Sequence, residues 1–524
     1  MKKYHSVLFI LMLLFISALF NQFKTNNFPP RSMHQWRQTD AYSITYNYYA
    51  EGMHFFEPKI HNQTSTEGKA VGEFPIIYCI DALIWKITGP SFFSARVLNL
   101  CIAFLGLFAL FKTIKLLLND YFFAFIIPVL IFSSPLYGFY SNSFLINIPA
   151  LSFLFIGWYY CLKFYYNKSS LLLVVSIFFL SIAGLLRPTM LIGFLPFYAV
   201  LFLELIGYFK STIFFKKTVH SAILILPAIF IYGWMTFTKN YNAANNSNYF
   251  LSTIRPIWEN ENIPLVWSKL SFGMFSEWYH TSVRTIFCLI FLWLILNPKK
   301  QNKFLFFFTC SIVLELILYV LLWFSNFDVH DYYLIEFFIL VPPLLICFLM
   351  YFKQNHESIF YSKSIRAMTI VAVCLSLFYG ASKTRMKYDK KVFFLTEIFL
   401  SEEEIAYWKW FHWDYDMKSK AYEKVTPYLR SLGIKRTDIV VSVPDQSPNI
   451  TLSLMDQKGY TSIYSSDENL HYYLPKFIKR GAKYLIVKDP IILENKKLAP
   501  FTKEKIGTFR NIQIYKLPSS KEQN

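Results

Sequence analysis

Cysteine is scarce in this sequence, and the C-terminal region lacks a glycine-rich phosphate-binding loop. The seven cysteines form no C-x-x-C pair, and residues 383–524 contain none. A disulfide framework or a cysteine-based metal site is therefore not expected, and the cysteines are interpreted as small apolar side chains of the interior. The C-terminal region has no glycine-rich phosphate cradle, so no nucleotide site is predicted there. The chain also has no internal repeat and no low-complexity segment.

Acidic residues are also few, 33 against 52 lysines and arginines, which gives a formal net charge of +19. In a soluble protein this excess would suggest nucleic acid as a partner. No basic helix and no stacking platform accompanies the charge, so nucleic acid binding is not expected.

Long apolar runs dominate what is present. Hydrophobic residues make up 55% of the chain and the mean hydropathy is +0.34, whereas a soluble protein averages about 45–50% apolar residues. Segments of this kind can cross a bilayer as helices. They predict an α-helical polytopic membrane protein with about 11 transmembrane helices, at residues 6–23, 92–111, 121–138, 148–162, 169–186, 189–208, 218–237, 285–297, 304–325, 334–352 and 367–382.

The lysines predict how these helices are oriented. The first run resembles a signal peptide, but no small-residue cleavage site follows it, so we interpret it as a retained anchor. Every alternate short loop is basic, which places these loops and the N-terminus in the cytoplasm. The basic residues are Lys2/Lys3, Lys112/Lys115, Lys163/Lys168, Lys210/Lys216/Lys217, Lys299/Lys300/Lys303 and Lys353/Lys363/Arg366. The segments 24–91, 139–147, 238–284, 326–333 and 383–524 then lie outside.

One apolar segment, residues 74–86, does not fit a membrane span. It is short, contains Asp81 and ends at Gly89-Pro90. A carboxylate at the centre of a span costs about 2.5–3.5 kcal/mol. We therefore predict a helix lying in the membrane interface.

The chain changes character near residue 383, where charged residues become dense and apolar runs shorten. Strands are predicted at 438–443, 461–464, 483–487 and 512–515, with helices between them, for example at 417–432 and 467–480. This alternation predicts a small α/β domain with a partly parallel sheet. The chain thus divides into a transmembrane domain (1–382, with the first outer loop at 24–91) and an extracytoplasmic domain (383–524).

A polar segment, Asp445-Gln446-Ser447-Pro448-Asn449, follows the first of these strands. At the carboxyl end of a parallel strand it could line a crevice. The favoured interpretation is a turn that caps the next helix.

The first outer loop carries the best catalytic candidate, Asp40, in a stretch rich in aromatic residues. Asp40 can act as a general base on an acceptor hydroxyl or amine. Arg37 and Gln38 could hold phosphate oxygens or orient the carboxylate, and Trp36 offers a face to a sugar ring. The alternative is that Asp40 only caps a helix beginning at Ala41.

Glu73 precedes the interfacial helix in Gly72-Glu73-Phe74-Pro75. A second carboxylate facing Asp40 would let one act as a base while the other binds a cation or an acceptor group. The alternative is an acid that merely favours a helix N-terminus.

Further polar residues interrupt the apolar runs on the predicted outer side. Arg187, in Leu186-Arg187-Pro188-Thr189, could bind a lipid phosphate or extend to the headgroups. The stretch Asp328–Tyr333 could bind a sugar or pyrophosphate group, or be a loop with interfacial tyrosines; a metal site is only weakly indicated. Asn142 and Asn147 offer neutral hydrogen bonds. The residues that share this face are Asp40, Glu73, Asn147, Arg187, His330 and Asp331, and Tyr332 and Tyr333 are further candidate substrate contacts of the same stretch.

The order of these features resembles the GT-C polytopic glycosyltransferases, over about residues 1–350. One span is followed by an outer loop with an Asp, a Glu-x-Pro before an interfacial helix, and Gly-Pro-Ser-Phe-Phe-Ser-Ala-Arg before the next span. An Arg-Pro-Thr and a His-x-Tyr-Tyr-type loop come later. The similarity is greatest to bacterial protein O-mannosyltransferases and lipid A aminoarabinose transferases.

The resemblance implies transfer of a sugar from a polyprenyl-phosphate carrier to a lipid, glycan or protein acceptor on the outer face of the cytoplasmic membrane. Asp40 matches the loop Asp of the family and Glu73 the acid before the interfacial helix; Arg187 and His330 match carrier or sugar contacts more loosely. No cofactor is required, and a divalent cation is left open. Phe74 stands where aminoarabinose transferases have a basic residue, and Ala41 where mannosyltransferases often have an acid. Phosphate binding then falls on Arg37, Arg96 or Arg187.

A transporter or flippase of lipid-linked sugars is the rival interpretation. It would use the same basic outer residues without chemistry at Asp40. Transporters tend to show repeated halves and polar residues at mid-membrane. Neither is clear in this sequence, so the enzyme is favoured.

Overall fold

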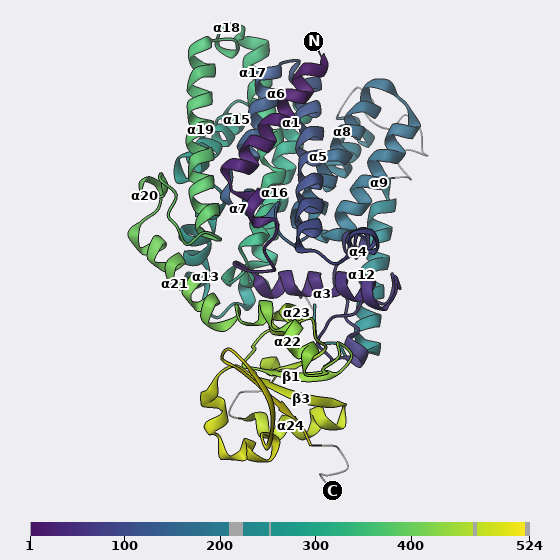
Figure 1. Ribbon diagram of the computed structural model, residues 1–524. Coiled ribbons are helices and arrows are strands. Elements are labelled where there is room, and N and C mark those ends of the chain that lie inside the picture. Colours follow the sequence, from purple (N-terminus) through teal and green to yellow (C-terminus); the bar gives the residue numbers. More distant parts are fainter. Residues whose placement is uncertain (1, 209–223, 251–252, 465–468, 519–524) are drawn as a thin grey trace. The chain divides into compact units, whose positions relative to one another are not determined.

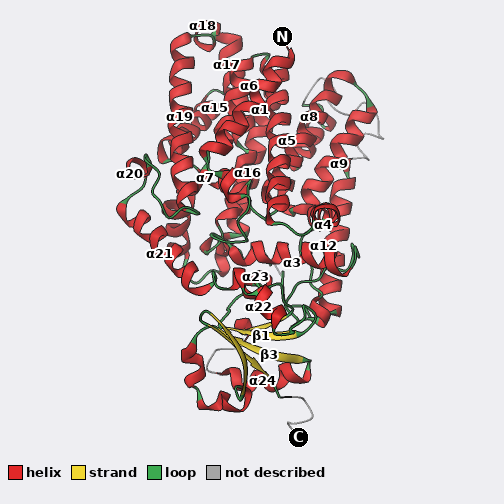
Figure 2. Cartoon of the chain, viewed as in Figure 1, coloured by secondary structure: helices red, strands yellow, loops and turns green. Residues whose placement is uncertain are grey.

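The chain is an α-helical polytopic membrane protein with a small C-terminal sheet, here described from a computed structural model (Figures 1 and 2). The structure describes residues 2–208, 224–250, 253–464 and 469–518. Chain contacts divide it into two units, and each is described by itself. Unit 1 comprises Met1–Asn26, Arg96–Thr236 and Ser252–Ser401; unit 2 comprises Asn27–Ala95, Phe237–Leu251 and Glu402–Asn524.

Every apolar run predicted from the sequence contains a helix in the described residues. These are α1 (Lys2–Leu19), α5 (Phe92–Leu118), α6 (Tyr121–Phe132) with α7 (Pro135–Tyr140), α8 (Asn147–Asn167), α9 (Ser170–Leu186), α10 (Leu195–Leu205), α12 (Leu226–Ala244), α15 (Thr281–Leu296), α16 (Lys303–Leu322), α17 (Val341–Asn355) and α19 (Lys363–Met386). The start of the predicted span 218–237, and the loop with Lys210, Lys216 and Lys217, lie outside the described residues.

The span count of eleven is not confirmed. Six described helices are long and apolar enough to cross a membrane, or seven if the bent pair Ile263–Trp278 and Thr281–Leu296 is one span. The helices in runs 6–23, 121–138 and 169–186 are apolar but shorter. Short helices connect the long ones: α2 (Gln22–Thr25), α13 (Ile263–Ser268), α14 (Phe275–Trp278), α18 (Glu357–Phe360) and α20 (Thr396–Phe399).

The cysteines are only partly interior. Cys79, Cys161 and Cys347 are buried, but Cys101, Cys288 and Cys374 are exposed. The exposed three lie on α5, α15 and α19, apolar helices whose outward surface faces lipid in a membrane protein. All seven thiols are free.

Unit 2 combines the first outer loop with the C-terminal region. Its helices are α3 (Gln35–Glu51), α4 (Ile76–Thr88), α21 (Glu402–Lys418), α22 (Thr426–Ser431), α23 (Ile450–Leu454) and α24 (Leu470–Lys479). Helix α4 confirms the predicted helix at 74–86 and is not among the candidate spans. Its position in the interface, and the domain boundary at 382, stay predictions.

The predicted partly parallel sheet is present (Figure 2). Its order is β2-β1-β3-β5-β4. Strand β1 pairs in parallel with β2 and with β3, and β5 pairs antiparallel with β3 and with β4. The strands are β1 (Ile439–Val443), β2 (Gly459–Thr461), β3 (Ala482–Val487), β4 (Glu504–Phe509) and β5 (Ile512–Lys516).

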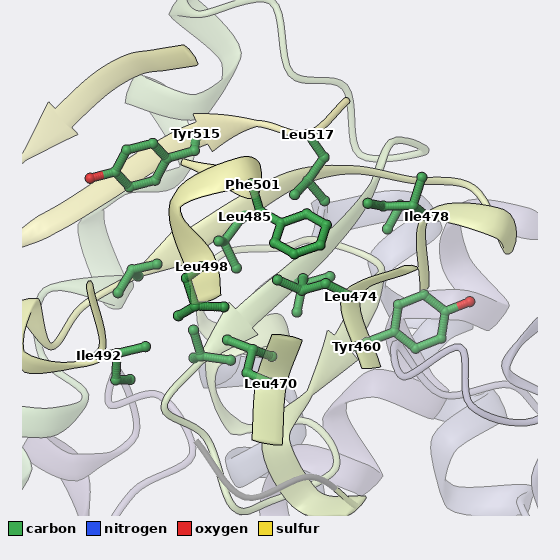
Figure 3. Packing of buried hydrophobic residues seen from close by; sticks show 14 residues of the cluster. Tyr460, Leu470, Leu474, Ile478, Leu485, Ile492, Leu498, Phe501, Tyr515 and Leu517 are labelled. Atoms are coloured by element: carbon green, nitrogen blue, oxygen red, sulfur yellow. The ribbon is translucent and has the colours of Figure 1, made fainter. Parts of the chain in front are cut away.

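Alternate strand residues build two cores, one on each face of the sheet. Val441, Leu485 and Tyr515 pack with Leu470, Leu474 and Ile478 of α24 (Figure 3), three residues spaced so that they share one helix face. Val440, Ile486 and Ile514 pack instead with residues of α22 and α23, among them Leu429 and Leu452. Helices therefore cover both faces of the sheet.

Two sequence predictions in this region are wrong in part, and one strand was missed. The predicted strand 461–464 ends at Thr461, because Ser462–Tyr464 form a 3₁₀ turn. The predicted helix 417–432 is broken before α22, whose first turn contains Pro427; proline suits a helix start but has no backbone N–H to continue a helix from the preceding residues. Strand β4 was not predicted, since an exposed edge strand with charges and a glycine has no apolar run.

The outer loop is hydrogen-bonded to the edge of this sheet within unit 2. Asn62 pairs with Gly459 of the edge strand β2 in a parallel bridge. The backbone N–H of Gln63 donates to the Gly459 carbonyl at 2.8 Å, and the Gly459 N–H donates to the His61 carbonyl at 3.1 Å. Helix α3 packs against α4 and α23, so residues far apart in sequence meet around α3.

Candidate functional site

Asp40 lies inside helix α3 and does not cap it. The helix begins at Gln35 after His34, whose φ of 50° ends the preceding turn. The Gln38 side chain closes that turn by donating to the carbonyls of Arg31 (3.0 Å) and Met33 (2.8 Å). The alternative of a cap at Ala41 is therefore wrong, and Asp40 is held on rigid backbone with 2% of its surface exposed.

Within the described residues, two side chains bind the Asp40 carboxylate directly, and two more are linked to it through Arg37. Asn449 donates from Nδ2 to Asp40 Oδ1 at 2.6 Å. Arg37 approaches Oδ2 from one turn earlier on α3, at 3.4 Å. Arg37 also forms an ion pair with Glu73, and Tyr78 donates its hydroxyl to the other Glu73 oxygen at 2.9 Å. The two predicted catalytic carboxylates are thus joined through one guanidinium.

Burial raises the pKa of Asp40 to about 6. The Arg37 charge and the Asn449 hydrogen bond act in the opposite direction, and the Glu73 charge adds a smaller upward contribution. A carboxylate near this value is a stronger base than an ordinary aspartate, yet is still ionised at neutral pH.

The other two residues predicted beside Asp40 take different positions. Trp36 is 45% exposed on α3. Gln38 is buried and serves the turn before the helix. Arg37 lies over the Phe250 ring, 5.0 Å from its centroid. Through its ion pairs with Asp40 and Glu73, Arg37 supplies positive charge to this site.

Unit 1 carries a second polar cluster. Arg187 pairs with Glu336 at 3.0 Å, and Thr189 donates to the same Glu336 oxygen. The guanidinium lies 5.2 Å from the Tyr333 ring and 5.8 Å from that of Tyr332. Arg187 is therefore not a lone charge, and Glu336 is a partner that the sequence analysis missed within an apolar run.

The predicted His330–Tyr333 stretch belongs to this cluster. The His330 and Tyr332 rings are stacked at 5.1 Å. Tyr140, from α7, donates its hydroxyl to Asp331 Oδ1 at 2.5 Å. The aromatic rings and the Arg187–Glu336 pair make a part-buried polar cluster in unit 1, formed by α7, the Arg187–Thr189 turn and residues 330–336.

Arg96 and Asn147 lie at the loop of residues 142–144 in unit 1. Arg96 is fully buried and donates to the carbonyl of Asn142 and, at 3.3 Å, to the Tyr388 hydroxyl. Its guanidinium faces the Phe144 ring at 4.7 Å. Arg96 thus holds the 142–144 loop, and Asn147 begins α8 just after that loop.

No group of three or more His, Cys, Asp or Glu side chains able to hold a metal ion is found within the described parts of the chain.

Asn449, like Tyr78, is a residue of the Asp40 site that the sequence analysis did not select. Its segment was interpreted as a turn or, less favoured, as the lining of a crevice, and the structure shows the turn. The Asp445 carboxylate accepts from the backbone N–H groups of Ser447 (2.9 Å) and Thr451 (2.8 Å), which forms the turn before α23. The end of that turn presents Asn449 to Asp40.

The fold is that of the GT-C membrane glycosyltransferases. The apo structure of ArnT from Cupriavidus metallidurans aligns with a TM-score of 0.56 at 10% identity, over 98% of each chain. The same enzyme bound to undecaprenyl phosphate gives 0.58 at 9% identity, over 97% of each chain. An apo oligosaccharyltransferase from Archaeoglobus fulgidus gives 0.51 at 12% identity, over 93% of this chain and 70% of that one. At such identities the likeness establishes the fold.

No protein-family model matches the sequence, and no curated protein does.

Proposed function

We propose that this protein is a glycosyltransferase of the cytoplasmic membrane. It transfers a sugar from a polyprenyl-phosphate carrier to a lipid, glycan or protein acceptor on the outer face. The N-terminus is cytoplasmic, and the C-terminal α/β domain, residues 383–524, is extracytoplasmic. The observation that carries the proposal is the buried Asp40 on α3, with Arg37 and Glu73 beside it, in a chain that shares its fold with ArnT.

Asp40 is the general base in this proposal. Its carboxylate removes the proton of the acceptor hydroxyl or amine while the acceptor attacks the anomeric carbon of the sugar. The bond from that carbon to the carrier phosphate breaks as the new bond forms, so a single displacement inverts the anomeric configuration. Glu73 orients Arg37 through their ion pair.

The departing phosphate carries negative charge, which arginines are suited to stabilise. Arg37 is next to Asp40, whereas in unit 1 Arg96 is fully buried and Arg187 is part-buried. Support for a polyprenyl-phosphate donor comes from the ArnT structure bound to undecaprenyl phosphate. A lipid phosphate is already a good leaving group, so the proposal needs no metal, and a divalent cation at the phosphate is compatible with it.

The test compares the wild type with Asp40→Asn in membranes of a strain that lacks the protein. The membranes receive undecaprenyl phosphate carrying a radiolabelled hexose or pentose, and label is counted in envelope glycan, lipid and protein. We expect Asp40→Asn to abolish transfer at an unchanged protein level. Asp414→Asn on α21, the same substitution at a carboxylate paired with Lys418, is the matched control. Unchanged transfer by Asp40→Asn would refute the role of Asp40 and favour a transporter.

A further inference from the structure

The hydrogen bond between Asn449 and Asp40 joins residues 409 positions apart in the chain. Both side chains are buried, and both belong to unit 2. Asp40 comes from the first outer loop and Asn449 from the segment between β1 and α23. The C-terminal region therefore supplies a ligand to the carboxylate that the proposed function makes the base.

The orientation of the Asn449 amide is fixed by a second contact. Its Oδ1 accepts from the backbone N–H of Asn62 at 3.0 Å. Asn62 in turn donates from Nδ2 to the Pro448 carbonyl at 2.9 Å, beside Asn449. With the oxygen committed to a backbone donor, the NH₂ group is directed to Asp40. A flipped amide would face oxygen to oxygen at Asp40 and nitrogen to nitrogen at Asn62.

We propose that Asn449 is a positioning residue for the transfer reaction, holding Asp40 Oδ1 so that Oδ2 receives the proton of the acceptor. This inference rests on the proposed function of Asp40. It makes the C-terminal α/β domain a participant in the chemistry, because removing that domain would remove the donor.

The distances distinguish the two carboxylate oxygens. Oδ1 has a short bond to the amide at 2.6 Å, whereas among the described residues the contact of Oδ2 is the long one with Arg37 at 3.4 Å. A base needs one oxygen that can exchange its partner for the incoming proton, and Oδ2 is the more weakly held. Asn449 stabilises the ionised form without adding a charge that would compete with a phosphate.

Ionisation of Asp40 reports this role directly. The charged and titratable groups that face Asp40 are Arg37 from α3, Glu73 from the outer loop and Tyr78 from α4. Asn449 is the neutral donor among them. Because hydrogen bonding to a carboxylate favours the charged form, losing this donor moves the ionisation of Asp40 to higher pH.

The experiment is an infrared titration of the protonated carboxyl band in the full-length protein, with each variant measured against its own Asp40→Asn counterpart. We expect Asn449→Leu to move the midpoint of the Asp40 band upward by about one pH unit. Asn469→Leu, at an exposed asparagine of the same unit whose side chain makes no capping hydrogen bond, is the control and leaves the midpoint unchanged.

Asn449→Asp covers the case in which Asn449→Leu does not fold. It keeps the side-chain size and an acceptor for the Asn62 N–H, but sets a second carboxyl against Asp40. The two then share a proton, and the last proton of the pair leaves at a higher pH than in the wild type. A midpoint unchanged in either folded variant overturns the inference. Because the titration uses no substrate, that result is separate from a failure of the transfer assay.

Discussion

Asp40 titrates in a range that its neighbours can move in either direction. Burial sets the upward shift of its pKa, while the Arg37 charge lowers the value and the Glu73 charge raises it. A general base works only when ionised, so transfer should increase as the pH rises through about 6.

Substitutions of Arg37 and Glu73 should shift the rising limb of the pH–rate profile, where transfer increases as Asp40 ionises, in opposite directions. Arg37→Gln removes a cation and shifts the limb to higher pH. Glu73→Gln removes an anion and shifts it to lower pH, by a smaller amount, because the Glu73 contribution is the smaller of the two. The measurement is the initial rate of sugar transfer from about pH 4.5 to about pH 8.5, a range that brackets the pKa of Asp40. Shifts in the same direction would mean that the limb does not report Asp40.

The same carboxylate should cost the protein stability. A raised pKa means that the folded state binds the Asp40 proton more tightly than the unfolded chain does. Between pH 3.8 and about 6 the wild type is therefore destabilised as the pH rises, and the full cost is present above about 6. About two pKa units correspond to about 3 kcal/mol.

Asp40→Asn should therefore raise the unfolding temperature at pH 7.5 while it abolishes transfer. The asparagine oxygen still accepts from Asn449, so the buried contact is kept. The gain should shrink to a small remainder near pH 4, just above the unfolded value of 3.8, because Asp40 is then protonated in the folded state and the unfolded chain is only about half ionised. Thermal unfolding in detergent at these two pH values checks this, and a variant less stable than the wild type at pH 7.5 would contradict it.

Helix α3 is attached to the C-terminal region by a charge network as well as by Asn449. Arg436 pairs with Glu51 at 3.1 Å and with Asp456 at 3.0 Å. It also donates to Asn47 at 2.7 Å and lies over the Tyr46 ring at 4.8 Å. One arginine thus binds the C-terminal half of α3 to the sheet region within unit 2.

We expect Arg436→Gln to destabilise the protein by about 1–3 kcal/mol, because a planar guanidinium with several part-buried partners is lost. Arg436→Lys should rescue little of this, since an ammonium cannot reach all partners at once. Arg510→Gln in the β4–β5 hairpin is the control. Thermal unfolding of the three variants is the measurement, and full rescue by lysine would show that only the charge matters.

The elements that could be predicted from sequence are those whose signal is local. Long apolar runs predicted helices such as α8 and α16, and short apolar runs predicted β1 and β3. Strand β4 has no such signal because it is an edge strand with exposed charges. The start of α3 was misplaced, since it depends on a side-chain bond from Gln38 back to the preceding turn.

Several single residues of the candidate site could be predicted from the sequence, but their distant contact partners could not. Asp40, Arg37 and Glu73 were selected because they lie in one loop. The partners Asn449 and Glu336 are distant in sequence from Asp40 and Arg187, and only packing brings them together. Nothing local separates Asn449 from any other turn asparagine, and Glu336 is accommodated in an apolar run because Arg187 neutralises it.

The membrane topology makes one prediction for the whole chain: both polar clusters face the same compartment. Trp36 and Val329 are exposed residues next to the two clusters, and Lys299 lies in a loop predicted to be cytoplasmic. In a cysteine-free background, Trp36→Cys and Val329→Cys should react with a membrane-impermeant maleimide added from outside. Lys299→Cys should react only after permeabilisation. Labelling of positions 36 and 329 from opposite sides would refute the arrangement.

The most direct test of the account measures bond cleavage in purified protein. Nanodiscs have no enclosed compartment, so a transporter gives no signal in them. The discs receive undecaprenyl-phosphate hexoses and pentoses and an envelope fraction as acceptor, and free undecaprenyl phosphate is measured together with glycosylated product. The account predicts that the wild type releases carrier phosphate in step with product and that Asp40→Asn lowers the rate by about 100-fold or more. Release that is absent in the wild type, or equal in Asp40→Asn, would contradict it.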